Sequence, residues 1–462
     1  MTISAYLCII NIKNAYHINK IDINFAEGDP MKRCLEDKLS AWKNSPNRKP
    51  LLLRGVRQCG KTYLLKKFGE KHYDDVAYFN FGENESLKSV FEGDLEPKRI
   101  ILELGVFGGK KINPATTLII FDEIQFCNRA ITALKYFQEN AGEYHLVCAG
   151  SLLGVALAKP LSFPVGKVDF LTLRPMNFYE FLLANGEELL GEYLAELKPN
   201  AKVSQLIHEK LITCLKNYFL TGGMPEVVRV WRDTQDIERV QTVQQKILDS
   251  YELDFAKHAP HHDFPKLSAI WRSIPRQLSK ENSKFIFSQV KKGWRAKDLE
   301  DALEWLTSAG LVYKVCKIEK PFLPLSAYAD QTFFKLYLVD VGLLSRMAKL
   351  PANVIFDRSE TYKEFKSALT ENFVLTELIA SSGETPYYWK SQNKAEVDFI
   401  TQIGTEIVPI EVKSATNDRS RSLAEYCKRY APKYTVKTSL KPLSGEKNVR
   451  NIPLYLIGRM AK

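Results

Sequence analysis

The feature that most constrains this chain is a glycine-rich loop between an apolar run and a helix-like segment. Residues 55–62 read Gly-Val-Arg-Gln-Cys-Gly-Lys-Thr, a complete G-x-x-x-x-G-K-[ST] pattern. The apolar run 51–53 precedes it, and the helix-like run 63–68 follows it. A strand before the loop and a helix after it form the context in which this pattern cradles phosphate groups. The loop therefore predicts a nucleotide site at the end of a buried strand.

Each residue type in the loop suits that chemistry. Glycines let the backbone curl so that successive N–H groups point at phosphate oxygens. A lysine places positive charge on the β- and γ-phosphates, which makes it a catalytic residue, and the threonine hydroxyl is a ligand for Mg²⁺. We therefore expect the whole loop to contact the nucleotide, through Gly55, Val56, Arg57, Gln58, Cys59, Gly60, Lys61 and Thr62.

A second part of the predicted site lies about sixty residues downstream. Residues 118–121 are an unbroken apolar run, typical of a strand buried on both faces of a parallel sheet, and Asp122 and Glu123 follow it. At the carboxyl end of such a strand, side chains face the ligand crevice. We expect Asp122 to hold Mg²⁺, mostly through water, and Glu123 to orient or deprotonate the attacking water. The alternative is an acidic strand end in an ordinary loop.

A third strand is predicted at residues 145–149, where it runs into Gly150 and Ser151. Ser151 is a candidate sensor of the γ-phosphate, and an ordinary turn is the alternative. Between the second and third strands, residues 129–140 show the apolar spacing of a helix. This alternation of strands and helices predicts a doubly wound α/β domain.

Composition sets the wider limits. A chain of 462 residues is expected to form two or three domains, and no run of eighteen apolar residues predicts a membrane span. We expect no signal peptide, and eight cysteines without a C-x-x-C pair indicate a reducing, cytoplasmic location. The net charge is +11, and residues 411–462 carry twelve Lys/Arg against four Asp/Glu. Such a stretch is a candidate nucleic-acid footprint or a solvated basic surface.

The middle of the chain has the pattern of a winged helix. Helices are predicted at 284–290 and 297–309 with Gly293 between them, and the alternating run 311–318 follows as a wing strand. Four basic residues precede or open the second helix, where they would suit phosphate contacts: Lys291, Lys292, Arg295 and Lys297. DNA binding is one interpretation, and a winged helix used only for packing is the other.

The C-terminal third brings three acids and a lysine into a recognisable order. A helix is predicted over 363–380, in which Glu371 has apolar neighbours and so needs a partner or a cation. Asp398 lies in a predicted strand. In the next strand, 408–413, the alternation places Glu411 and Lys413 on one face and three apolar side chains on the other.

The chain resembles the prokaryotic AAA-type ATPases that carry a C-terminal domain called DUF4143. The resemblance spans roughly residue 31 to the C-terminus and implies an ATP-binding, Mg²⁺-dependent AAA+ core, a helical region, and a C-terminal domain related to restriction-type nucleases. It rests on several motifs in the family's order, namely Arg57-Gln58 in the loop, Asp122-Glu123-Ile124-Gln125, the runs 134–137, 149–154, 163–168 and 175–181, and Gly222-Gly223-Met224-Pro225-Glu226.

From this resemblance we expect an ATPase domain over 31–235, a helical, winged-helix-like region over 236–325 and the DUF4143 domain over 326–462. Residues 1–30 are outside the resemblance and are expected to be a weakly ordered extension. Cys59 departs from the small apolar residue usual in the family and predicts sensitivity of the loop to thiol reagents.

The C-terminal residues also resemble the PD-(D/E)XK nucleases. Carried over by position, Asp398 and Glu411 would bind a second Mg²⁺ or Mn²⁺, Lys413 would position water, and Glu371 would be an auxiliary acid. The alternative is a nuclease-like fold that binds without cleaving. The resulting hypothesis is an ATPase that couples its nucleotide state to a nucleic-acid-binding or nuclease-like domain, with DNA as the candidate partner and no membrane. The competing hypothesis is a regulatory ATPase switch for protein partners, with a silent nuclease-like domain. Oligomeric state, and DNA against RNA, stay open.

Overall fold

The structure is a computed structural model. It describes residues 31–151, 166–197, 201–260, 262–280, 284–351, 363–391, 395–414, 421–446 and 448–460. The expected N-terminal extension, 1–30, and the motif residues 152–154 and 163–165 lie outside the described residues. No helix within these described segments is long and apolar enough to cross a membrane.

The first sheet has five parallel strands in the order β2-β3-β4-β1-β5. Sequence neighbours are separated in this order, as a doubly wound sheet requires. The predicted parallel α/β fold is therefore confirmed. The strands are β1 (Leu51–Arg54), β2 (Asp75–Asn80), β3 (Thr117–Asp122), β4 (His145–Ala149) and β5 (Asp169–Thr172).

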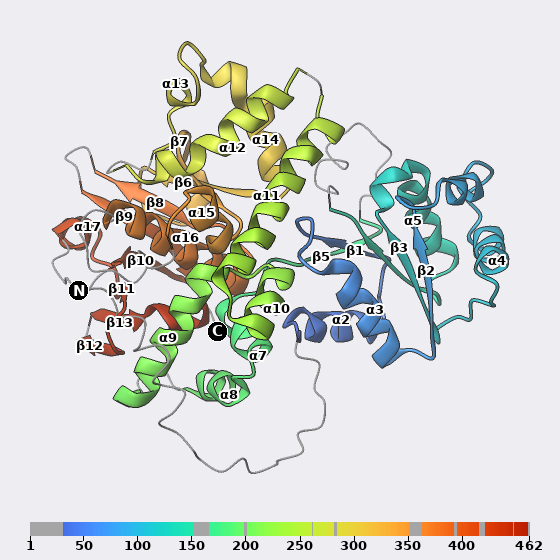
Figure 1. The fold of residues 1–462 in the computed structure, drawn as a ribbon, viewed down its shortest axis with the longest axis horizontal. Helices are drawn as coiled ribbons and strands as arrows, with labels where there is room; N and C mark the ends of the chain where they lie inside the picture. The colour runs from blue at the N-terminus through green and yellow to red at the C-terminus, as the bar shows by residue number, and fades with distance from the viewer. Residues whose placement is uncertain are drawn as a thin grey trace. The chain divides into compact units, whose positions relative to one another are not determined.

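Helices cover this sheet on both faces (Figure 1). Leu51 and Leu53 of β1 pack in one core cluster with side chains of α2 (Leu35–Lys43) and α3 (Lys61–His72). The intervening Leu52 packs in a second cluster with α4 (Pro97–Gly108) and α5 (Asn128–Asn140). Because alternate side chains of a strand point to opposite faces, burial on both faces explains why these strands are continuous apolar runs.

A series of helices follows the first sheet. Asn177 caps the first of them and Glu180 completes a capping box, so this helix begins at a fixed point after β5. The helices are α7 (Phe178–Ala184), α8 (Glu188–Glu196), α9 (Gln205–Thr221), α10 (Pro225–Thr234), α11 (Ile237–His258), α12 (Phe264–Leu278), α13 (Phe287–Val290) and α14 (Ala296–Ser308).

The second sheet has eight strands in the order β12-β13-β11-β10-β9-β8-β6-β7. Val408, Ile410 and Val412 of β10 pack with the core residues of α16, as the predicted alternation requires. The C-terminal part of the chain consists of β6 (Val312–Ile318), β7 (Ala329–Leu338), α15 (Val341–Met347), α16 (Lys363–Ser382), β8 (Tyr387–Lys390), β9 (Glu396–Ile403), β10 (Glu406–Val412), α17 (Arg421–Tyr430), β11 (Thr435–Ser439), β12 (Ser444–Glu446) and β13 (Val449–Pro453).

The winged-helix-like segment differs in two respects from its predicted form. The helix expected over 284–290 begins only at Phe287, because the Phe285 amide donates to the Phe334 carbonyl (2.8 Å) and the Ile286 amide to Gln277 Oε1 (2.7 Å). The wing strand β6 does form a hairpin with β7, but its other edge pairs with β8. The hairpin is therefore part of the eight-stranded sheet.

One buried carboxyl predicts how stability changes with pH. Glu377 on α16 is buried, and its Oε1 accepts a hydrogen bond from the Phe178 amide at the start of α7 (2.8 Å). Burial raises the pKa of Glu377 to about 8, and the nearby Glu180 contributes to that rise. A carboxyl with a raised folded-state pKa favours folding in its protonated form, so its contribution is full below about pH 4 and is lost as the pH rises through 8.

Glu377→Gln, which keeps the size of the protonated side chain, is therefore expected to flatten this dependence. The variant should be more stable than the natural chain at pH 8.5 by an amount on the order of 3 kcal/mol, with the gap closing toward pH 5. Urea unfolding at several pH values measures it, with the exposed Glu384→Gln on the following turn as control. Parallel stability curves for the natural chain and Glu377→Gln would contradict the assignment.

Candidate nucleotide site and C-terminal carboxylate cluster

The predicted phosphate loop connects β1 to α3, and two positions in it require glycine. Gly55 has φ 153°, and a Cβ there would overlap the carbonyl oxygen of Leu173. Gly60 has φ 93° and is the residue before α3, which begins at Lys61. The left-handed conformation at Gly60 aims the first amides of the helix into the loop, where the partial positive charge of the helix terminus favours phosphate.

Lys61 is buried and folded over the loop. Its Nζ donates to the carbonyl oxygens of Gly55 and Val56, both at 2.9 Å. These acceptors belong to the loop itself, so the ammonium lies where the β- and γ-phosphates are expected and can exchange a carbonyl for a phosphate oxygen. The predicted placement of Lys61 is consistent with this geometry.

The next residue joins the loop to the acidic end of β3. Thr62 Oγ1 donates to Asp122 Oδ2 at 2.7 Å, and the Tyr78 hydroxyl donates to the same oxygen at 2.9 Å. The other oxygen of Asp122 accepts from the Glu123 amide at 3.0 Å. A buried carboxylate beside a hydroxyl is an all-oxygen donor set that fits Mg²⁺. Thr62 and Asp122 are therefore the residues that would hold the ion.

Glu123 follows the strand in a left-handed conformation, φ 51°. Its Oε2 accepts hydrogen bonds from the side-chain amide of Gln125 and from Ser151 Oγ, the latter at 3.4 Å. A non-glycine residue in this region costs of order 1 kcal/mol, and such conformations concentrate at functional sites. The structure thus places the candidate sensor, Ser151, beside the candidate catalytic glutamate.

The helical region contacts the loop through two residues that the sequence reasoning missed. Asp254 of α11 forms an ion pair with Arg57, and the Tyr251 hydroxyl of the same helix donates to the Arg57 carbonyl at 3.0 Å. The Asp254 side chain is 8% exposed and that of Arg57 is 48% exposed. The loop and α11 are therefore joined by both a charge pair and a backbone contact.

A buried arginine supports the loop from the N-terminal side. Arg33 Nη1 donates to the Cys59 carbonyl at 3.0 Å, and its Nε lies 3.2 Å from Glu180 Oε1. The burial of Cys59 argues against the predicted sensitivity of the loop to thiol reagents. Its side chain is 0% exposed, and its Sγ packs 3.5 Å from the Leu173 carbonyl oxygen, so no reagent reaches it without opening the loop.

The four residues predicted for a nuclease-like centre lie near one another, with Asp398 on β9, Glu411 on β10, Lys413 directly after β10, and Glu371 on α16. Lys413 Nζ lies 2.6 Å from Glu411 Oε1, and Asp398 Oδ2 accepts from the Val412 amide at 2.7 Å. Burial, followed by the negative charges of Glu371 and Glu411, raises the pKa of Asp398 well above its usual range. The acids are therefore close enough to repel one another.

Three further charged residues complete this group, and the sequence reasoning missed them. Lys335 of β7 is 1% exposed, and its Nζ lies 2.6 Å from Glu396 Oε1 and 3.5 Å from Glu371 Oε2. Lys390 Nζ lies 2.9 Å from the other oxygen of Glu396. We call the whole set the carboxylate cluster, comprising the acids Glu371, Glu396, Asp398 and Glu411 with the lysines Lys335, Lys390 and Lys413.

Lysine contacts occupy part of the oxygen surface of the carboxylate cluster. Among the residues that the structure describes, no three or more His, Cys, Asp or Glu side chains are grouped so as to hold a metal ion. One buried oxygen, Glu411 Oε2, has no hydrogen-bond partner, but the other oxygen of that carboxylate is bound to Lys413. Lysines contact both oxygens of Glu396 and one oxygen each of Glu371 and Glu411.

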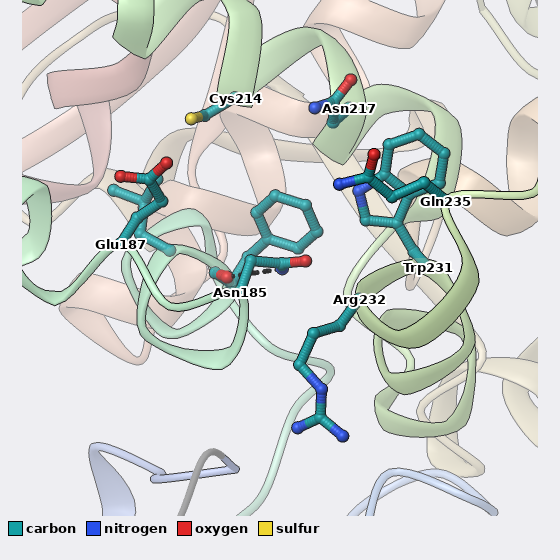
Figure 2. A pocket seen from close by; sticks show the side chains of 9 residues that line it. Asn185, Glu187, Cys214, Asn217, Trp231, Arg232 and Gln235 are labelled. Carbon is teal, nitrogen blue, oxygen red and sulfur yellow. Dashed lines mark hydrogen bonds between the residues drawn. The ribbon is translucent and has the colours of Figure 1, made fainter. Parts of the chain in front are cut away.

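A separate pocket of about 120 Å³ lies among α7, α9 and α10 (Figure 2). It is lined by Phe181, Leu182, Asn185, Glu187, Cys214, Asn217, Trp231, Arg232 and Gln235. These residues do not overlap with the phosphate loop or with the carboxylate cluster. The two sites predicted from the sequence are therefore distinct from this pocket.

Family comparisons match the first, α/β part of the chain and its C-terminal part. Residues 47–182 match the family described as an AAA domain, and residues 366–457 match DUF4143, a domain of unknown function. The chain thus carries an AAA-type, ATP-binding domain and a DUF4143 domain, which confirms that part of the resemblance. Residues 212–354 match a further domain of unknown function, DUF8612, whose span extends past both ends of the predicted middle region.

Individual relatives are distant. An uncharacterized protein of Methanocaldococcus jannaschii, MJ1544, is 23% identical over 362 residues, which cover 76% of this chain and 71% of that protein. Among solved structures, the Walker-type ATPase PABY2304 of Pyrococcus abyssi is 15% identical with a TM-score of 0.45, over 69% of this chain and 96% of that one. The Aeropyrum pernix ORC2 protein is 14% identical with a TM-score of 0.38, over 75% and 96%.

Proposed function

We propose that this protein is an Mg²⁺-dependent ATPase whose nucleotide state controls nucleic-acid binding by its helical and C-terminal regions. The observation that carries the proposal is the double contact between the loop and α11, in which Asp254 pairs with Arg57 and Tyr251 bonds to the Arg57 carbonyl. Because α11 is bonded to the phosphate loop, the preferred position of this helix depends on the conformation that the loop adopts around a nucleotide.

The residues of the nucleotide site support hydrolysis as follows. Lys61 would exchange its loop carbonyls for phosphate oxygens. Thr62 and Asp122 would hold Mg²⁺, which when bound would supply positive charge to the phosphates. Glu123 orients the attacking water and accepts its proton. Ser151 and Gln125 hold the Glu123 carboxylate through its Oε2. The reaction then depends on positioning and electrostatics supplied by one end of the sheet.

The route from the loop to the rest of the chain follows packed helices. The apolar side chains of α11 belong to the same core cluster as those of α12 and α14. Phe255 of α11 contacts both Trp271 of α12 and Trp305 of α14 edge to face. Since α14 leads directly into β6 of the eight-stranded sheet, a shift of α11 is transmitted to the winged-helix-like segment and to that sheet.

Exposed basic residues supply the nucleic-acid side of the proposal. Four exposed basic residues lie just before and at the start of α14, namely Lys291, Lys292, Arg295 and Lys297. Further lysines and arginines follow β10, in the stretch 411–462 that carries twelve Lys/Arg against four Asp/Glu. Phosphate contacts of this kind bind with little sequence preference and weaken steeply with salt.

The test is the affinity of a fluorescent DNA duplex for the full chain at low salt, measured with Mg-ADP and with a non-hydrolysable ATP analogue. We expect affinities that differ by about fivefold or more, the usual lower range of allosteric coupling. Asp254→Asn removes the charge that holds Arg57 and should bring the two affinities within about twofold while ATP binding is retained. The matched control is Asp249→Asn, an exposed acid of the same helix.

The possible outcomes separate the parts of the proposal. Equal affinities in the natural chain would contradict coupling, and no binding in any nucleotide state would contradict nucleic acid as the partner. The second result favours the alternative, a regulatory ATPase switch for protein partners. Metal-dependent cleavage at Asp398, Glu411 and Lys413 is a separate alternative, the nuclease-like one, and it requires a divalent ion at these residues. It predicts loss of cleavage in Lys413→Ala with ATP hydrolysis intact.

A further inference from the structure

Lys335 is the most completely enclosed charge in the carboxylate cluster. Its side chain is 1% exposed, although it lies on β7, the last strand of the sheet order. An unpaired ammonium in such surroundings would be strongly destabilising, so its partners decide whether it can stay charged. Glu396 and Glu371 are those partners, at 2.6 and 3.5 Å, and the ring of Tyr388 lies under the ammonium with its centroid at 5.2 Å.

We propose that Lys335 is the resident cation of the carboxylate cluster, and that the cluster is held together without a divalent metal. The lysine joins acids from two different elements, Glu371 of α16 and Glu396 of β9. A metal ion shared by strand and helix carboxylates would make the same kind of link. Lys335 therefore supplies positive charge beside Glu371 and Glu396, next to the residues Asp398 and Glu411 at which the nuclease-like interpretation places an ion.

Further hydrogen bonds and ion pairs occupy other oxygens of the carboxylate cluster. Tyr337, two residues along β7, donates its hydroxyl to Glu371 Oε2 at 2.8 Å, the same oxygen that faces Lys335. Lys390 and Lys413 each take one carboxylate oxygen, from Glu396 and Glu411 respectively. Ligands for Mg²⁺ or Mn²⁺ must be oxygens free to approach at about 2.1 Å. Here an ammonium would first have to be removed from Glu371 and Glu396.

Manganese binding by the full chain tests this inference in the absence of nucleotide and DNA, so its result does not depend on the proposed ATPase function. Free Mn²⁺ is measured by electron paramagnetic resonance during titration of the natural chain. We expect the amount of bound Mn²⁺ to be the same in the natural chain, in Asp398→Asn and in Glu411→Gln. Stoichiometric Mn²⁺ binding that is abolished by either variant, and unchanged in Asp122→Asn, would overturn the proposal.

Removing the lysine should create the metal dependence that the natural chain lacks. Lys335→Met leaves Glu371 and Glu396 without their shared cation, and its melting temperature should be lower in EDTA and rise by about 5 °C in excess Mn²⁺. The natural chain should shift by less than about 1 °C under the same conditions. A natural chain that Mn²⁺ stabilises as much as it stabilises the variant would contradict the inference. If Lys335→Met does not fold, the titration of the natural chain with Asp398→Asn and Glu411→Gln still decides.

Discussion

Replacing Glu123 by Gln is expected to lower the rate constant for ATP hydrolysis by about 100-fold or more while ATP binding is retained. The substitution keeps the size of the side chain and its hydrogen-bonding capacity toward Gln125 and Ser151, but the amide cannot accept a proton from the attacking water. Single-turnover hydrolysis of Mg-ATP measures the chemical step, and a fluorescent ATP analogue measures binding.

The control for this variant is Glu143→Gln, an exposed acid in the turn before β4. It should hydrolyse ATP at the natural rate, because its carboxylate lies outside the set of residues that surround the loop. A Glu123→Gln variant that turns over at more than about a tenth of the natural rate would show that Glu123 is not the base. Loss of binding together with hydrolysis would instead show that the substitution disturbs the loop.

Gly223→Ala is expected to destabilise the fold by at least about 3 kcal/mol, the largest effect on stability that we anticipate from a single methyl group. A Cβ at Gly223 would overlap the carbonyl oxygen of Met176 and lie 2.7 Å from its amide nitrogen. Backbone atoms cannot move aside like a flexible side chain. The Gly223 carbonyl also accepts from the Met176 amide (2.7 Å), and its amide donates to buried Asp340 (2.6 Å).

Urea unfolding followed by circular dichroism measures this loss, and Gly142→Ala is the matched control. A Cβ at Gly142 meets only the Gln138 carbonyl oxygen at 3.7 Å, an ordinary contact, so stability should change by less than about 0.5 kcal/mol. Equal stabilities for the two variants would contradict the close approach at Gly223. Gly223, the second residue of the Gly-Gly-Met-Pro-Glu motif, thus has a packing explanation that is independent of nucleotide chemistry.

The place of the candidate nucleotide site in the fold could be predicted from the sequence because the strand, loop and helix that form it are adjacent in the chain. Gly60 precedes a helix in a left-handed conformation, which favours glycine. Asp122 follows an unbroken apolar run, and such a run is typical of a buried strand. The buried strands β1, β3 and β4 were predicted within a residue or two for the same reason. Ser151 lies beside Glu123 because parallel strands end at one edge of the sheet.

The contacts around the loop could not be predicted because they join residues far apart in the chain. Asp254 lies 197 residues from Arg57, and no spacing rule relates them. The contacts of Arg33 and Tyr78 could not be predicted either, because each residue reaches the site through tertiary packing. The predicted start of the helix at residue 284 is wrong for a similar reason. Gln277 and Phe334 accept hydrogen bonds from the backbone amides just before Phe287 and hold that segment extended.

Lys335, by contrast, has a recognisable signal in the sequence. The run 333–338 reads Phe-Phe-Lys-Leu-Tyr-Leu, and a lysine inside an apolar strand is costly unless an acid is buried with it. Glu371 presents the opposite problem, because it is an acid among apolar neighbours in a predicted helix. Two buried charges of opposite sign that each need a partner favour a contact between β7 and α16, and such a pairing rule could have predicted it from the sequence alone.

ATP bound at the loop is expected to change nucleic-acid binding elsewhere in the chain. Glu123→Gln, which should hold ATP without hydrolysing it, isolates the ATP-bound state. A labelled duplex is titrated with this variant at low salt, once with Mg-ATP and once with Mg-ADP. We expect dissociation constants that differ by about fivefold or more. Identical constants in the two nucleotide states, with both nucleotides shown to be bound, would contradict it.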